Sequence, residues 1–155
     1  MIIKTISEKK LVGISLQMSL AENKTFSLWQ SFMPIRKDIT NSLNTDLISM
    51  QVYDRPMEIG NMVQTFNKWA AVEVSDFNNI PEGMKPFNID GGLYAVFCYR
   101  GLSTDVSIFH YIFGQWLPNS NYVLDHRPHF EVLGAKYKNN DPNSEEEIWV
   151  PIKNK

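Results

Sequence analysis

The sequence has very little cysteine and no long apolar run. Among its 155 residues Cys98 is the only cysteine, which excludes a disulfide framework and a zinc site built on cysteine pairs. No stretch approaches the roughly 18 apolar residues of a membrane-spanning helix. The N-terminus, Met1 to Thr5, lacks the apolar core of a signal peptide. We therefore expect a cytoplasmic protein that makes no membrane contact.

An excess of positive charge is absent as well. Fifteen Lys and Arg residues against 17 Asp and Glu residues give a net charge of −2, and the only basic run is Lys9-Lys10. Because nucleic-acid-binding domains usually carry a basic face, we expect no direct nucleic-acid binding. A phosphate-binding glycine loop and a serine in a nucleophile-elbow context are also missing, and we expect no cofactor.

What remains is the composition of one ordinary globular domain. Hydrophobic residues make up 43% and charged residues 21% of the chain, close to average usage, and a chain of this length can bury a core unaided. Aromatic residues make up 12% and include four tryptophans, which can serve either a core or the wall of a ligand site. We expect a single domain over residues 1–155.

Apolar spacing predicts strands in both halves of the chain. The predicted ranges are 2–7, 11–18, 48–53, 69–75, 84–89, 93–99, 130–137 and 146–153. The range 93–99 is apolar on both faces, which is typical of a central strand. Lys9-Lys10 is expected to form a turn between the first two strands, and Asp90-Gly91-Gly92 a hairpin turn.

Two segments change to helical spacing and predict the main helices, at 25–39 and 103–117. Thr25 is the expected N-cap of the first helix, and Pro34 predicts a kink or a late start. Loops are expected at 55–66 and 78–85.

The order hairpin, helix, hairpin occurs twice, over about 1–80 and 84–155, with Trp69 and Trp149 at equivalent places. We therefore expect an α+β fold of two β-α-β-β units related by a pseudo-twofold axis, with antiparallel sheets. A ligand groove is expected at this axis, since clefts between substructures are common binding sites.

Four segments, taken together, resemble the gyrase-inhibitor-like (GyrI-like) effector-binding domains. They are residues 89–97 (IDGGLYAVF, followed by Gly101), 115–122 (QWLPNSNY), 127–132 (RPHFEV) and 146–152 (EEIWVPI). In the family, the corresponding signatures are I-P-A-G-x-Y-A-V-F, W-L-P-x-S-G-Y, P-D-F-E-x-Y and E-I-x-I-P-I, in the same order. Asp90, Gly91 and Asn121 depart from these signatures, and the N-terminal half matches only in element order and in Leu28-Trp29-Gln30.

The resemblance implies a central pocket for hydrophobic, often cationic compounds, as in drug-responsive bacterial regulators of the AraC and MerR types. It also implies that Glu131 is the pocket glutamate. Those regulators carry a DNA-binding domain, whereas this sequence starts at its first strand, so we expect that it does not regulate transcription alone. Some family members hydrolyse reactive cyclopropane-containing toxins, which leaves an enzymatic function open.

The pattern around Glu131 also makes it the first candidate for ligand binding. Strand alternation places it on one face with His129, Leu133, Ala135 and Tyr137, and the opposite face is apolar too. Burying an unpaired carboxylate costs several kcal/mol or raises its pKa. Such a group is retained when a partner, a network or a charged ligand compensates. The alternative is a structural carboxylate bonded to tyrosine hydroxyls or to Arg127.

Aromatic side chains are the candidate walls of the pocket, because they attract cations and stack on flat ligands. Trp69 and Trp149 are preferred, since they share strand faces with Glu73 and Glu147 rather than with the obvious core residues. The other candidates are Tyr94, Tyr99, Trp116 and Tyr137. The alternative is that strand aromatics are simply core, and this is what we expect of Phe97 and Phe109.

The remaining polar groups are expected to be structural. The run Glu145-Glu146-Glu147 is interpreted as a solvated strand start, and Cys98 as a buried, inert thiol. His126 and His129 stand three apart near Asp125, which makes only a weak metal set, so we expect no metal.

Three functions follow from the sequence as alternatives. The first is a module that binds small hydrophobic, planar and possibly cationic compounds, for sequestration or regulation, with Glu131 facing the charge. The second is a hydrolase of reactive electrophilic small molecules, with Glu131 as general base. The third is a protein-interaction module whose partner is unknown.

Overall fold

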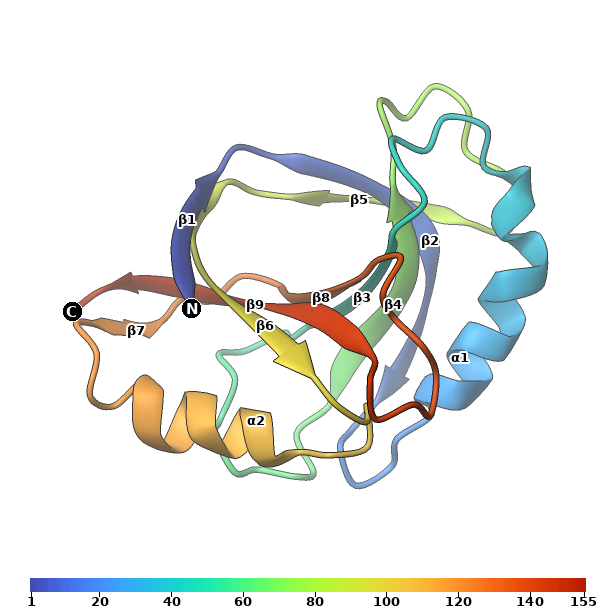
Figure 1. Ribbon diagram of the computed structural model, residues 1–155. Helices are drawn as coiled ribbons and strands as arrows, with labels where there is room; N and C mark the ends of the chain where they lie inside the picture. The colour runs from blue at the N-terminus through green and yellow to red at the C-terminus, as the bar shows by residue number, and fades with distance from the viewer.

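A computed structural model describes residues 1–155 and has the predicted α+β composition (Figure 1). Helix α1 (Thr25–Phe32) continues as the 3-10 helix η1 (Met33–Asp38), and helix α2 (Ser107–Tyr111) continues as the π-helix η2 (Ile112–Trp116). Neither helix is long and apolar enough to cross a membrane. The strands are β1 (Ile2–Ile6), β2 (Lys9–Met18), β3 (Leu47–Val52), β4 (Phe66–Glu73), β5 (Lys85–Ile89), β6 (Gly92–Arg100), β7 (Tyr122–Leu124), β8 (His129–Leu133) and β9 (Glu145–Asn154).

The sheet joins two similar units, one from each half of the chain. Its strand order is β1-β6-β9-β8-β3-β4-β2-β5, with every neighbouring pair antiparallel and β7 added beside the end of β9. The first half supplies β2-β4-β3 and the second half supplies β6-β9-β8, so the units meet where β3 pairs with β8. This arrangement agrees with the duplicated order expected from the sequence.

A bent ribbon connects the two units at the other side of the sheet. Ile6 pairs with Gly92 and Lys9 pairs with Ile89, so β1-β6 and β2-β5 share one register. The N-terminal strands and β5-β6 therefore run together as a single antiparallel ribbon that bends between its two parts (Figure 1). A Cβ at Gly91 would lie 2.7 Å from the carbonyl oxygen of Ile6, so glycine permits the close approach at this bend.

Both turn predictions were wrong, because the chain bends at these places within a continuous ribbon. Lys9 and Lys10 are the first residues of β2, and the chain changes direction before them. The residues around Gly91 do not form a hairpin, because β5 and β6 pair with β2 and β1 rather than with each other. Turn residues indicate only that the chain changes direction. They do not indicate which strands pair, and here the partners of β5 and β6 come from the other half of the chain.

Several element boundaries also differ from the predictions. The first helix becomes a 3-10 helix at Met33, because Pro34 lacks the N–H that an α-helix would use there. The second helix begins at Ser107, whose N–H donates to the Asp105 side chain at 2.9 Å. Strand β8 ends at Leu133 instead of residue 137, and the short strand β7 was not predicted.

The curled sheet has one face covered by the helices and one inner face, with separate cores on them. On the helix-covered face, α1 packs over β2 and β4 with Leu28 and Phe32, and the α2 segment packs over β6 and β9 with Ile112 and Leu117. The inner face carries a third cluster, which we call the inner core. It contains Leu11, Ile48, Met50, Trp69, Ala71, Ile89, Tyr94, Val96, Phe130 and Trp149.

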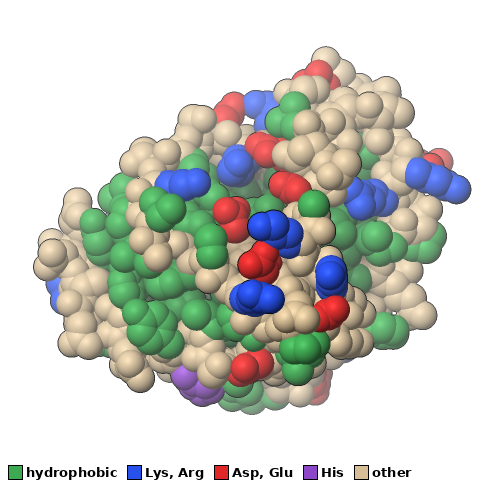
Figure 2. Space-filling view, viewed as in Figure 1, with side chains coloured by type: hydrophobic (Ala, Val, Ile, Leu, Met, Phe, Trp, Pro, Cys, Tyr) green, Lys and Arg blue, Asp and Glu red, His purple; other side chains and the backbone are tan.

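The surface view distinguishes apolar from charged regions of the molecule. Figure 2 shows hydrophobic side chains gathered on the side where α2 lies. Lys, Arg, Asp and Glu side chains are mixed near the centre of the same view. The charge on this face is therefore of both signs, in keeping with the net charge of −2.

Candidate functional site

Glu131 lies at the middle of the helix-covered face, on β8. Its neighbours in the sheet are Ser49 on β3 and Ile148 on β9. The strands β3 and β8 separate the core under α1 from the core under α2, and Figure 1 shows the two helices on either side of them. The half-buried carboxylate of Glu131 is therefore placed where the two units of the sheet meet.

Glu131 has neither an arginine nor a tyrosine as its partner. The Arg127 guanidinium bonds instead to Asp125, at 2.7 Å, and to the carbonyl oxygens of Leu93 and Ile152. The hydroxyl of Tyr99 donates to Leu102 and that of Tyr94 to Pro128. The structural alternative considered from the sequence, a carboxylate bonded to Arg127 or to tyrosine hydroxyls, is therefore not what the structure has.

A second glutamate shares the environment of Glu131. Glu146, opposite Tyr99 in the β6–β9 pair, is half-buried. Burial, followed by the charge of Glu131 and a hydrogen bond with it, raises the pKa of Glu146 to about 8. Glu146 therefore keeps its proton to a higher pH than an ordinary glutamate does, with Glu131 as its hydrogen-bond partner. This corrects the interpretation of Glu146 as part of a solvated strand start.

Lys68 is the third charged member of this group. Strand alternation places it on the helix-covered face with Phe66, Ala70 and Val72. Its side chain is only 8% exposed, and it takes part in no ion pair. Burial lowers the pKa of Lys68, and the charges of Glu131 and Glu146 oppose that shift. We call Lys68, Glu131 and Glu146 the polar cluster.

Two of the predicted aromatic residues stand next to the polar cluster. Burial raises the pKa of Tyr137, a hydrogen bond with Ser103 opposes this, and the charges of Glu146 and Glu131 raise it further. Burial, Asp105 and Glu146 raise the pKa of Tyr99. Tyr99 packs against the core under α2, on the face of Glu131, and the charge of Glu146 acts on both tyrosines. That Tyr99 and Tyr137 contact a ligand together with Glu131 stays a prediction.

Three other predicted aromatic residues lie in the inner core, on the opposite face of the sheet. Trp149 stacks on Phe130 with ring centroids 5.1 Å apart, and Tyr94 packs edge-on against both rings. Trp69 packs edge-on against Phe87 at 5.3 Å. The structure therefore does not bring Trp69, Tyr94 and Trp149 together with Glu131. That these three residues contact a ligand from the inner face stays a prediction.

Trp116, the last predicted aromatic residue, belongs to the core under the α2 segment. Its ring packs edge-on against Phe97 at 5.1 Å and stacks on Tyr122 at 6.4 Å. It is thus on the same face as Glu131, and it is held by its own aromatic neighbours. Phe97 is a buried core residue and Phe109 packs against the same core, as expected.

His129 flanks Glu131 on the same strand and is a neutral, buried ring. Burial, followed by the positive charges of Arg127 and His126, lowers its pKa to about 3. The ring lies edge-on to Tyr53 at 5.8 Å and 6.3 Å from Phe113. His129 therefore acts as an aromatic wall at neutral pH.

We expect His129→Phe to reduce the loss of stability on acidification. The folded-state pKa of His129 lies below its ordinary value of 6.5, so the folded protein binds fewer protons than the unfolded chain. Stability present above pH 6.5 is therefore lost as the pH falls towards 3, by up to about 1.4 kcal/mol per pH unit. Urea denaturation at pH 7, 6 and 5 measures this slope. An identical slope in the variant would contradict the assignment.

Cys98 is exposed, contrary to its expected burial. It pairs with Glu147 beyond the last inner-core residue of β6, Val96. The apolar run around Cys98 predicted burial, but the inner core ends before the strand does.

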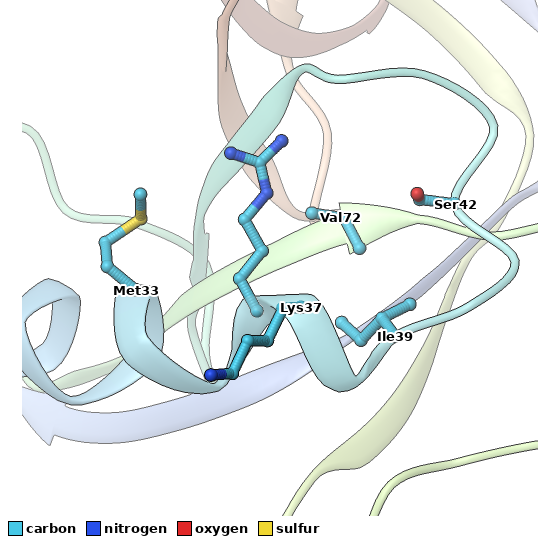
Figure 3. Close-up of a pocket in the computed structure, with 6 residues that line it drawn as sticks. Met33, Lys37, Ile39, Ser42 and Val72 are labelled. Carbon is cyan, nitrogen blue, oxygen red and sulfur yellow. The ribbon is translucent and has the colours of Figure 1, made fainter.

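Two depressions open elsewhere on the surface. One, of about 320 Å³, lies beside η1 and is lined by Met33, Arg36, Lys37, Ile39, Ser42 and Val72 (Figure 3). The other, of about 270 Å³, is mostly apolar and includes Phe113, Leu117 and Leu124. No member of the polar cluster lines either depression.

Comparison with known proteins identifies a family and several more distant relatives. The family profile of the integron-associated effector binding proteins matches residues 2–152. The transcriptional regulator BrlR of Pseudomonas aeruginosa is 24% identical over 148 residues, which cover 92% of this chain and 51% of BrlR. The chain thus spans about half the length of that relative.

Two solved structures show the same fold. SAV2435 bound to tetraphenylphosphonium has a TM-score of 0.68 and 18% identity, covering 97% of this chain and 92% of its own. The C-terminal domain of EcmrR has a TM-score of 0.71 and 15% identity, covering 99% and 97%. Because the profile matches nearly the whole sequence, the chain belongs to the family of integron-associated effector binding proteins (Cass2) and has the GyrI-like effector-binding fold.

Proposed function

We propose that the chain binds a small hydrophobic, positively charged aromatic compound on the helix-covered face, with Glu131 facing the positive charge. The observation that carries this proposal is the placement of Glu131. It is a half-buried carboxylate at the junction of the two units, without an arginine or tyrosine partner. A charged ligand would provide the compensation that such a carboxylate needs.

The surroundings of Glu131 suit an aromatic cation. Tyr99 and Tyr137 both experience the charge of Glu146, and an aromatic face attracts a cation by roughly 0.5–2 kcal/mol. The fold is also that of SAV2435, whose ligand tetraphenylphosphonium carries four phenyl rings around a positive phosphorus. We expect the same class of compound to be recognised here, by charge and by aromatic contact together.

Two consequences of binding fit the family. The chain either sequesters its ligand or passes the bound state on to a partner, as a ligand-binding unit of a regulator would. BrlR, a transcriptional regulator, is about twice as long as the region that matches this chain.

Two probes of one shape and opposite charge test the proposal. Tetraphenylphosphonium and tetraphenylborate share their tetraphenyl geometry, so isothermal titration calorimetry with both separates charge from shape. We expect saturable binding of the cation in the micromolar range and at least tenfold weaker binding of the anion. Absence of saturable cation binding, or equal affinity for both probes, would overturn the proposal.

A further inference from the structure

The polar cluster contains a group that a cation-binding site does not need. Lys68 is more than nine-tenths buried and takes part in no ion pair. The pKa of its ammonium group is lowered by burial and raised by the charges of Glu131 and Glu146. No hydrogen bond contributes to this pKa. Its ammonium group has no acceptor in the protein and keeps some contact with solvent. A ligand on the face of Glu131 could therefore replace water as the acceptor for this group.

The sheet register fixes how the two charges are arranged. Lys68 on β4 pairs with Gln51, while Glu131 on β8 pairs with Ser49, and both partners belong to β3. The two charged residues are therefore two strands apart and offset by two positions. With strands about 4.8 Å apart, their backbones are separated by on the order of 10 Å.

We infer that the preferred ligand of this site is a planar aromatic zwitterion, whose cationic end faces Glu131 and whose anionic end faces Lys68. This inference rests on the proposed function and narrows its ligand class. This backbone separation favours a ligand with well-separated charges over compact zwitterions such as free amino acids, in which the charges are only about 3 Å apart. It favours a flat, fused ring system that carries a delocalised cation and bears its carboxylate on a separate arm.

The competing interpretation makes Lys68 a mere counter-ion of the two glutamates. In that case, Lys68 would stabilise the protein and hold the acidic pair in place without meeting the ligand. The two interpretations differ in one observable, which is the response of binding to a carboxylate on the ligand.

Rhodamine B and its ethyl ester form a matched pair for this test. They share one chromophore, and esterification converts the zwitterion into a cation. Fluorescence anisotropy with wild-type protein should show the zwitterion binding five- to twentyfold more tightly than the ester. In Lys68→Met, that preference should disappear and the ester should bind more tightly than it binds to wild type.

The control variants separate a local effect from a loss of folding. Lys85→Met removes an exposed lysine on the inner face, above the Trp69 ring, and should leave the dye preference unchanged. Lys68→Arg keeps the positive charge and should retain at least part of the preference, which covers the case that Lys68→Met does not fold.

The outcomes for this inference and for the proposed function are distinct. Equal affinity of wild type for the two dyes, with tetraphenylphosphonium still bound in a Glu131-dependent way, would overturn the zwitterion inference alone. Equal weakening of both dyes in Lys68→Met would also overturn it, in favour of the counter-ion. Failure of the wild type to bind either dye or tetraphenylphosphonium would overturn both.

Discussion

Replacing Glu131 by glutamine is expected to weaken tetraphenylphosphonium binding about ten- to a hundredfold. The substitution keeps the shape of the side chain and removes its charge, while tetraphenylborate should bind equally well or better. Two opposite charges about 6 Å apart attract each other by roughly 3 kcal/mol at an effective dielectric constant of 20, and part of that is lost to desolvation. Calorimetric titration of wild type and variant with both probes measures the change.

Glu147→Gln is the matched control for this variant. Glu147 is also half-buried, but it sits on the inner face, where its carboxylate accepts a hydrogen bond from the Trp149 indole at 3.2 Å. Glu147→Gln should leave the affinity for tetraphenylphosphonium within about twofold of the wild-type value. A large loss in Glu147→Gln and none in Glu131→Gln would move the ligand to the inner face, beside Trp69, Tyr94 and Trp149.

The affinity for tetraphenylphosphonium should rise with pH between about 6 and 8 and level off above. Glu146 holds a proton in the free protein because its pKa is about 8. A bound cation favours the ionised carboxylate and lowers that pKa, so binding below pH 8 releases protons. Affinity therefore increases by up to about tenfold per pH unit across this window.

Calorimetry in two buffers with different ionisation enthalpies counts the released protons directly. At pH 7, we expect a release of up to one proton per cation bound, and none for tetraphenylborate. Glu146→Gln should abolish both the release and the pH dependence. A wild-type affinity for the cation that is the same at pH 6 and pH 8 would show that Glu146 is not coupled to the ligand.

Much of the fold could be predicted from local patterns. Period-two and helical spacing located eight of the strands and both helices, because burial of one face is encoded along each element. The predicted hairpin at Gly91 was wrong. This glycine lies at a bend between β5 and β6, which pair with the N-terminal strands β2 and β1 rather than with each other. Pairing between distant segments leaves no local sign in the turn.

Local patterns likewise predicted only a part of the candidate site. Alternation around Glu131 correctly placed it on one face with His129 and Leu133. Lys68 was missed, although it falls in the alternating series Phe66, Lys68, Ala70, Val72, which marks it as facing a core. Glu146 could not be recognised, because its raised pKa comes from burial in the folded sheet and from Glu131, a residue of another strand.

The tryptophans illustrate what alternation cannot decide. Trp69 and Trp149 were placed on the faces of Glu73 and Glu147, and the pairing of the strands agrees with this. Which of the two faces the helices cover depends on how the whole sheet curls. The inner face proved to carry a core of its own, filled by both indoles.

The bent ribbon ties the two units of the molecule into one cooperative system. The N-terminal strand leaves the first unit and completes the sheet of the second, while β5 of the second half completes the sheet of the first. Each half of the chain therefore supplies an edge strand to the unit formed by the other half. Neither unit forms all of its backbone hydrogen bonds alone. Folding must close a loop of half the chain before this exchange is made, which favours slow folding with both halves forming together.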